Sequence, residues 1–462
     1  MVEYRNNICF FEDNKESELE KFVGIQIYST FELKGIGGVY KNSYKDFVVQ
    51  EITENGNVLG FRKDKQLSTT DNYSKYKYTT FNLVKVNRDT FDAVRLISKA
   101  LKIPVDKIEY SGLKDKCSLS VQRISIPGNF VDRLKKLNIR DVFIRDISLS
   151  KRSIRLGSNW GNKFTITIRN VEKKSKNKKN IEKSLFKIKQ SGFPNYYGLQ
   201  RFGTFRPNSH LIGRYLLENK FKEAYNEFIL NTYSTESELS RNVRIELRDT
   251  ANLEKALEQF PKSLNYERQI LKYLINNPGD YEGAMRHLPS YLIKLILSSF
   301  QSYLFNKLLS LRVKKGHSLF KPANGDVISI LDDMDGQLTQ IKYIFGGSYD
   351  TYLKEALNLK RASIVIPLVG YDSNLDEFPL MQSLLLDILE EEQISPSIFH
   401  HDLLKDHDFK GSYRSMLVRP KDLNLIEIEP DDIFQNKQKV KIEFSLSKGS
   451  YATMLLREIM KM

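Results

Sequence analysis

The chain has 462 residues, of which 40% are hydrophobic, and a formal net charge of +15 at pH 7. This length is too great for one ordinary domain and suits two or three. No apolar run approaches the roughly 18 residues of a membrane span, and the first residues lack the order of a signal peptide. Two cysteines, Cys9 and Cys117, supply neither a disulfide framework nor a zinc site. We therefore expect a cytoplasmic protein without membrane contact.

The positive charge is concentrated in one stretch. Residues 151–220 contain 17 lysines and arginines, three glutamates and no aspartate, a net charge of +14. The same stretch holds Trp160 and the segments "KFTITIRN" and "YYGLQRFG", so we expect it to fold. Basic charge interleaved with aromatic rings suits a nucleic acid, and RNA is favoured because no helix-turn-helix or zinc-finger spacing is present. The alternative is a basic face that is merely solvated.

The first third of the chain alternates strand and helix signals. Residues 46–52 and 78–87 are rich in β-branched and aromatic residues, which is typical of strands. Asp89 is a candidate N-cap for a helix over 90–103, in which Phe91, Val94, Ile97 and Leu101 recur at helical spacing. Residues 121–127 and 163–170 return to strand character. The pattern predicts an α+β sheet domain.

A largely helical block follows, from about Leu211 to Arg361. Its helical segments are residues 255–260, 268–275 and 288–313. Residues 439–460 then read as a strand, a turn at Gly449 and a short helix. We expect three segments, 1–210, 211–365 and 366–462, and if the last joins the first in one sheet, the middle one is an insertion.

The common catalytic and metal-binding patterns are missing. His400, His401 and His407 lie among aspartates, but their spacing fits no familiar metal site and favours a polar surface turn. The "GIGGV" run at residues 35–39 lacks the full phosphate-binding glycine pattern and reads as a turn. The low-complexity run at residues 172–183 reads as a solvated loop or the start of a helix.

Two segments remain as candidate sites. In "YSGLKDKCSLSVQ" (residues 110–122), Gly112 argues against a helix, so Asp115 should lie on a loop between two lysines. In "NYYGLQRFG" (residues 195–203), Asn195, Gln200 and Arg201 stand beside aromatic residues. Such a segment suits a nucleoside pocket in which a ring stacks on the base, amides read its edge and Arg201 meets a phosphate or carboxylate. The alternative is a tyrosine-rich structural turn.

These two segments resemble the signature motifs of the TruD family of tRNA pseudouridine synthases, in its archaeal and eukaryotic branch. Four further segments resemble other motifs of the family, in the family's order: "YKNSYKDFVVQE", "IRLGSNWGNKF", "GSYRSMLVRP" and "LSKGSYATMLLREI". The resemblance covers about Lys41 to Glu458. It implies a pseudouridine synthase catalytic domain with a mixed, mostly antiparallel sheet, divided in sequence by an inserted TRUD domain, residues 211–365.

The reaction implied is isomerisation of uridine to pseudouridine without metal or organic cofactor. Asp115 matches the family's essential aspartate, which would act at C1′ or C6 of the uridine. Lys41 matches an active-site lysine whose charge would favour the ionised form of Asp115. Asn195 matches an asparagine that would hold the aspartate loop or the base. Lys114 and its neighbour Lys116 would assist Asp115 or face phosphates.

Tyr197 departs from the family pattern, which usually has phenylalanine at this position. Either ring can stack on the base, and the tyrosine hydroxyl could also assist removal of the C5 proton. Ser120, where the family commonly has threonine, keeps the hydroxyl. Cys117 is expected to be a small buried residue.

The resemblance further implies tRNA as the partner, uridine 13 of the D arm as the target, and flipping of the base out of its stack. No obligate protein partner is predicted. Two alternatives stay open at this level. One is an RNA-binding protein or chaperone that has lost the chemistry; the other is a uridine hydrolase that uses the same carboxylate and releases free uracil.

Overall fold

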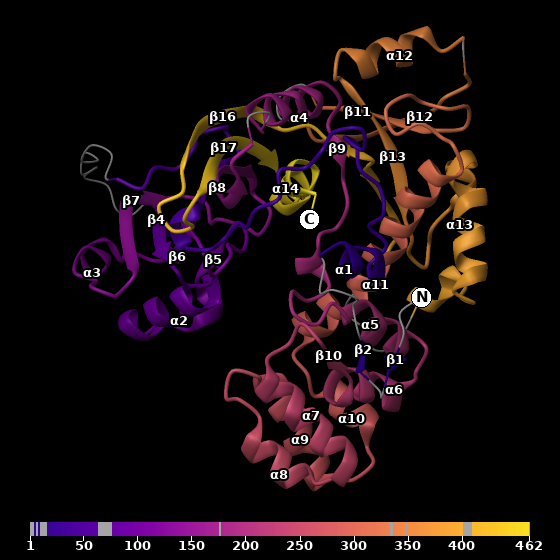
Figure 1. Ribbon diagram of the computed structural model, residues 1–462. Coiled ribbons are helices and arrows are strands. Elements are labelled where there is room, and N and C mark those ends of the chain that lie inside the picture. Colours follow the sequence, from indigo (N-terminus) through magenta and orange to yellow (C-terminus); the bar gives the residue numbers. More distant parts are fainter. Residues whose placement is uncertain are drawn as a thin grey trace.

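The computed structural model of the protein describes residues 4–5, 8–9, 16–62, 76–174, 177–332, 336–347, 349–400 and 409–461 (Figure 1). The cluster of histidines falls largely on residues 401–408, which lie outside the described residues. Within the described ranges, no helix is long and apolar enough to cross a membrane.

A large mixed sheet organises one lobe (Figure 1). Its strand order is β16-β17-β8-β3-β6-β4-β7, and β5 pairs with β6 at the side. Only β3 and β6 run parallel, while the other pairings are antiparallel. The strands are β3 (Phe47–Thr53), β4 (Tyr78–Val86), β5 (Glu109–Tyr110), β6 (Leu119–Pro127), β7 (Val142–Ser150), β8 (Asn159–Glu172), β16 (Lys421–Pro430) and β17 (Lys437–Ser447). The predicted α+β class and sheet type are confirmed.

Helices cover the large sheet in two groups. The side chains of α2 (Thr90–Leu101) and α3 (Val131–Lys135) pack with those of β4, β6 and β7, while α4 (Asn177–Ser191) and α14 (Ala452–Met460) pack near β16 and β9. Asp89 caps α2 as predicted, since its side chain accepts from the backbone N–H of Asp92. The helical spacing would put Phe91 on the buried face of α2, but this is wrong, since Phe91 is 48% exposed. Thr90 and Ala93 are buried on that face instead.

The middle of the chain forms a helical lobe and a smaller sheet (Figure 1). The helices are α5 (Ser209–Leu217), α6 (Phe221–Tyr225), α7 (Glu238–Thr250), α8 (Leu253–Gln259), α9 (Asn265–Asn276), α10 (Tyr281–Arg286), α11 (Ser290–Lys314), α12 (Thr351–Asn358) and α13 (Pro379–Glu391). The smaller antiparallel sheet has the order β12-β11-β13-β14, with β11 (Val327–Leu331), β12 (Leu338–Ile344), β13 (Ala362–Leu368) and β14 (Ser412–Ser415). Short elements complete the description: α1 (Glu16–Phe22), β1 (Tyr4–Arg5), β2 (Ile8–Cys9), β10 (Thr232–Tyr233), β9 (Phe193–Pro194) and β15 (Leu417–Val418).

The middle block is inserted between strands of one sheet, because β17 pairs with β8 along most of its length. The boundary expected at residue 365 falls inside β13, and β14 then adds to the same small sheet. The helix α13 also packs against α11. We therefore propose that the inserted block extends to about residue 416, where β15 pairs with β9 and the chain returns to the large sheet.

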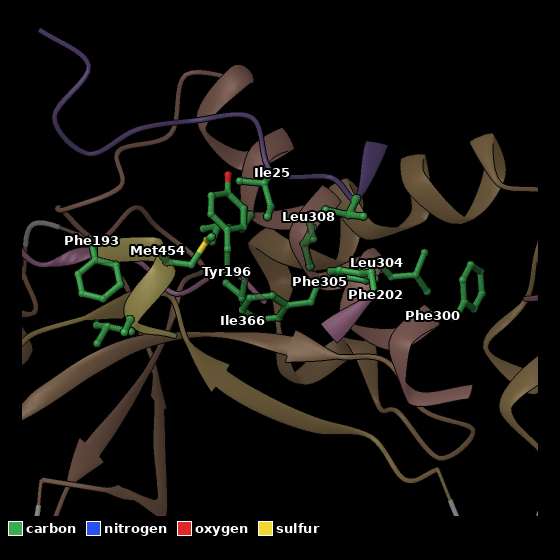
Figure 2. Close-up of a cluster of buried hydrophobic side chains, with 14 of the residues drawn as sticks. Ile25, Phe193, Tyr196, Phe202, Phe300, Leu304, Phe305, Leu308, Ile366 and Met454 are labelled. Atoms are coloured by element: carbon green, nitrogen blue, oxygen red, sulfur yellow. The ribbon is translucent and has the colours of Figure 1, made fainter. Parts of the chain in front are cut away.

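One hydrophobic core joins the lobes (Figure 2). Side chains of the "NYYGLQRFG" segment lie beside those of α11, β13 and α14, and the core includes residues before Ile36. The labelled members are Ile25, Phe193, Tyr196, Phe202, Phe300, Leu304, Phe305, Leu308, Ile366 and Met454. This shared core fixes the helical block against the segment that carries Asn195 and Tyr197.

Candidate active site

Asp115 lies on the loop between β5 and β6, as the glycine before it predicted. Two side chains bind its backbone carbonyl oxygen: Ser118 Oγ donates at 2.7 Å and Lys85 Nζ donates at 2.7 Å. Upstream in the loop, Gln122 Nε2 donates to the carbonyl of Gly112 at 3.1 Å. Lys85 lies on β4 and Gln122 on β6, so the sheet itself determines where Asp115 stands.

The carboxylate of Asp115 forms an ion pair with Lys41. The distance from Lys41 Nζ to Asp115 Oδ2 is 2.7 Å, and the side chains are 21% and 47% exposed, respectively. Lys41 has a backbone φ of 58°, in the left-handed region, and its Nζ lies 4.3 Å from the centroid of the Phe47 ring. Cys117 is half-buried and its Sγ donates to the Lys41 carbonyl at 3.5 Å. The pair is open to solvent on the carboxylate side, where a substrate can approach.

Lys85 is fully buried beneath this loop and has no carboxylate within hydrogen-bond distance among the described residues. Its Nζ donates to the carbonyl oxygens of Arg88, at 2.5 Å, and Asp115. Burial lowers the pKa of Lys85 to about 8, against the opposing effects of Asp115 and Asp89 and with a further lowering by Lys114. A buried ammonium that binds only backbone carbonyls therefore holds the Asp115 loop.

Lys114 does not face the open side of the site. Its Nζ lies 2.9 Å from Glu51 Oε2, and both side chains are buried, at 3% and 1% exposure. Glu51 also accepts from the backbone N–H of Arg123 at 3.1 Å. This placement corrects the expectation that Lys114 contacts substrate, because its charge is already neutralised inside the protein. Lys116, by contrast, is exposed.

The second predicted segment gathers around Arg414. The Nη2 of Arg414 donates to Asn195 Oδ1 at 2.5 Å and to the Gly449 carbonyl at 2.7 Å, and its Nε donates to the Asn195 carbonyl at 3.1 Å. The guanidinium carbon lies 4.3 Å from the centroid of the Tyr197 ring. Asn195 is buried, and its Nδ2 donates to the Ser415 carbonyl. Arg414 thus covers one face of the half-buried Tyr197 ring.

Helix α11 fixes the backbone on both sides of Tyr197. Asn306 Oδ1 accepts from the Tyr197 N–H at 2.9 Å, and Asn306 Nδ2 donates to the Tyr197 carbonyl at 3.0 Å. Rings of Phe305 and Tyr451 contact the Tyr197 ring edge-to-face, with centroids 5.5 and 6.1 Å away. The ring orientation is therefore set by elements that are distant in sequence.

Gln200 and Arg201 are engaged by neighbouring side chains. Arg201 Nη2 donates to Ser298 Oγ at 2.6 Å and its Nε to Ser302 Oγ at 3.2 Å, both on α11. Gln200 Nε2 donates to Thr453 Oγ1 on α14 at 3.2 Å. These contacts hold the segment against α11 and α14.

The aspartate loop and the Tyr197 cluster are connected through the loop that precedes β8. The Gly157 N–H donates to the Ser111 carbonyl at 2.7 Å, and Lys448 Nζ donates to the Gly157 carbonyl at 2.8 Å. Gly449, next to Lys448, accepts from Arg414. No direct hydrogen bond or ring contact joins Asp115 to Tyr197 among the described residues.

Sequence motifs alone did not identify Lys85 and Arg414. Lys85 interrupts an apolar strand, which is an unusual place for a lysine and therefore a usable signal. Arg414 lies in the "GSYRSMLVRP" segment, where no local pattern distinguishes the arginine from its polar neighbours. In the described part of the chain, no group of three or more His, Cys, Asp or Glu side chains could hold a metal ion.

Comparisons with known proteins define the class. Residues 22–459 match the family model described as tRNA pseudouridine synthase D (TruD). A protein of Methanosarcina mazei named as a probable tRNA pseudouridine synthase D is 32% identical over 450 residues, which cover 96% of this chain and 98% of that protein. A probable tRNA pseudouridine synthase D 1 of Methanocaldococcus jannaschii is 32% identical over 426 residues, covering 92% of this chain and 96% of that protein.

A crystal structure shows the same fold. It is that of a Methanosarcina mazei protein named "Putative tRNA pseudouridine synthase D (TruD)", and it superposes with a TM-score of 0.72 at 31% identity, covering 96% of this chain and 98% of that one. The fold and site thus define a pseudouridine synthase, an isomerase. The chain belongs to the TruD family of tRNA pseudouridine synthases.

Proposed function

We propose that this enzyme converts uridine 13 in the D arm of tRNA to pseudouridine, with Asp115 as the catalytic carboxylate. The observation that carries the assignment is the half-exposed carboxylate of Asp115 in its 2.7 Å ion pair with Lys41. In the reaction the C1′–N1 bond of uridine breaks, the uracil rotates, a C1′–C5 bond forms, the C5 proton leaves to solvent and N1 takes up a proton. Apart from these protons, the product contains the same atoms as the uridine, so the overall reaction needs no group donor or redox cofactor.

Asp115 acts as a nucleophile toward C1′ or C6, and this requires the ionised carboxylate. Lys41 orients the carboxylate through one charge-assisted hydrogen bond of 2.7 Å. The bonds from Lys85 and Ser118 to the Asp115 carbonyl keep the carboxylate in place while the uracil detaches and turns. Positioning of this kind is a large part of an enzyme's rate advantage.

Tyr197 is the platform for the flipped base. Arg414 covers one face of its ring, so that face is closed to a stacking uracil. Such stacking contributes about 1–3 kcal/mol per base. Asn195 acts indirectly, since it holds Arg414 by its side-chain oxygen and backbone carbonyl. The target base must leave its helical stack to reach this cluster.

The basic stretch of residues 151–220 supplies the contact with the tRNA backbone. It includes the exposed Lys178 and Lys179 at the start of α4. Phosphate contacts of this kind give most of the affinity and make it fall steeply with salt.

The test uses an unmodified tRNA transcript labelled with tritium at uridine C5. Wild type should release tritium without releasing uracil, and Asp115→Asn should release none while still binding the transcript. A transcript with cytidine at position 13 and label at its other uridines should release no tritium. Release of free uracil would favour the hydrolase, and full activity of Asp115→Asn would remove Asp115 from the mechanism.

A further inference from the structure

A pocket of about 470 Å³ lies beside the aspartate loop, between α2 and residues 154–156. Most of its surface is apolar. Its lining includes Phe91, Arg95, Asp106, Glu109, Tyr110 and Arg155. None of these residues belongs to the site described above.

Aromatic rings from two lobes meet at this pocket. Phe91 contacts Tyr110 edge-to-face, with centroids 6.3 Å apart, and its centroid is 6.4 Å from that of Tyr291 at the start of α11. Phe91 and Tyr291 are nevertheless 48% and 58% exposed. The core-facing positions of α2 are filled by other residues, so Phe91 does not contribute its ring to the core. A large ring left at a pocket edge is suited to stacking on a planar ligand.

The two arginines of the pocket are available for an anion. Neither Arg95 nor Arg155 forms an ion pair within the described chain, and both are exposed. The acidic lining residues have other partners, since Glu109 accepts from Ser125 Oγ at 3.3 Å and Asp106 lies 4.0 Å from Lys107 Nζ. An aromatic wall beside uncommitted guanidinium groups is the combination that binds a base together with its phosphate.

The pocket is close to the catalytic loop along the chain. Tyr110 directly precedes Ser111, and Ser111 accepts from Gly157, the neighbour of Leu156. The five residue-to-residue steps from Tyr110 to Asp115 span at most about 18 Å even when extended. An RNA strand bound at Asp115 can therefore reach the pocket within a few nucleotides.

We propose that this pocket binds one unpaired nucleobase of the RNA substrate, a few nucleotides from the target uridine, with its base stacked on Phe91 and its phosphate facing Arg95 and Arg155. The inference rests on the proposed function, because it takes the substrate to be RNA. It adds a second point at which the enzyme reads an unstacked base.

The experiment combines a protein change with an RNA change. Phe91→Ala, Phe91→Tyr and the control Tyr352→Ala, at a residue 82% exposed on α12, are compared with wild type. The RNAs are the tRNA transcript and variants in which one nucleotide near the target is abasic. Equilibrium binding and tritium release are measured for each pair.

We expect Phe91→Ala to weaken binding of the intact transcript between about fivefold and a hundredfold, from the worth of one stacked base. Its kcat should be unchanged, and Phe91→Tyr and Tyr352→Ala should resemble wild type. One abasic position should weaken binding to wild type by a similar factor and add nothing to Phe91→Ala. That lack of additivity identifies the nucleotide in the pocket.

The inference would be overturned if Phe91→Ala weakened the binding of every abasic RNA by the same factor as it weakens binding of the intact transcript. The ring would then serve only to join α2 and α11. Unchanged binding would overturn it as well. If Phe91→Ala fails to fold, Arg155→Ala is put through the same cycle. Binding without tritium release by wild type would count against the proposed function alone, since the binding cycle reads the pocket independently.

Discussion

Replacing Lys85 with methionine should lower catalysis more than stability. Methionine has nearly the length of lysine but donates no hydrogen bond, so the carbonyl oxygens of Arg88 and Asp115 lose their shared partner. A buried acceptor left unpaired costs about 1–3 kcal/mol. Against this, the desolvation that lowers the Lys85 pKa from 10.5 to about 8 costs the folded wild type about 3 kcal/mol, and the variant is relieved of it. The two effects largely cancel in the free energy of unfolding.

Catalysis has no such compensation. With Lys85 gone, only Ser118 Oγ binds the Asp115 carbonyl, and the carboxylate gains freedom to leave its position. Misplacement of a catalytic group by about 1 Å can cost on the order of a hundredfold. We expect kcat to fall between about tenfold and a hundredfold, with KM for the transcript unchanged.

The same substitution should remove a characteristic pH dependence of stability. Because the pKa of Lys85 is lower in the folded state, the unfolded chain binds more protons between pH 8 and pH 10.5, and the free energy of unfolding rises with pH there. Between about pH 7.5 and pH 9.5 this contribution amounts to about 2 kcal/mol. From pH 7.5 to pH 9.5, the free energy of unfolding of the wild type should therefore rise by about 2 kcal/mol relative to that of Lys85→Met.

Urea unfolding at the two pH values measures the stability difference, and single-turnover tritium release measures the catalytic step. The control is Lys441→Met, which breaks a half-exposed 3.0 Å pair with Glu427 and should change stability by no more than about 1 kcal/mol. Unchanged kcat in Lys85→Met would refute the positioning role. A stability difference between wild type and Lys85→Met that does not vary with pH would refute the assignment of a lowered pKa.

Three further outcomes are expected. Arg414→Met should lower kcat/KM for tritium release about a hundredfold, and Arg414→Lys should restore little because an ammonium cannot match the fork of a guanidinium. Arg312→Met should lower the free energy of unfolding by about 3–5 kcal/mol, measured by urea denaturation, because it strands the fully buried Asp326; adding Asp326→Leu should recover part of the loss. Changing Lys178 and Lys179 to glutamine should flatten the slope of log affinity against log salt by about 0.7–0.9 for each phosphate that the protein no longer neutralises.

The sequence predicted best those features that depend on short-range rules. Asp89 and the apolar spacing after it located α2, and Gly112 with its charged neighbours placed Asp115 on a loop. The strands β3, β4, β6 and β8 of the large sheet followed from runs of β-branched and aromatic residues. In each case the determining residues lie within one element or its cap, where local propensity and capping decide the outcome.

The predictions that failed depend on distant partners. Lys114 reads as an exposed cation in its own segment, but Glu51, 63 residues away, pairs with it in the interior. Arg414 gains its place from Asn195, 219 residues earlier. No local pattern contains these partners, because pairing across the sheet and between lobes is decided by the whole fold.

The inserted block completes the aromatic half of the site. Its longest helix, α11, holds both backbone groups of Tyr197 through Asn306 and anchors Arg201 through two serines. Tyr196, between Asn195 and Tyr197, is fully buried and hydrogen-bonds Ser310 on the same helix at 2.7 Å. Without this helix, the core that packs the "NYYGLQRFG" segment would be exposed and the Tyr197 ring would lose its orientation. The helical insertion is therefore part of the scaffold that holds the proposed base platform, as well as a separate lobe.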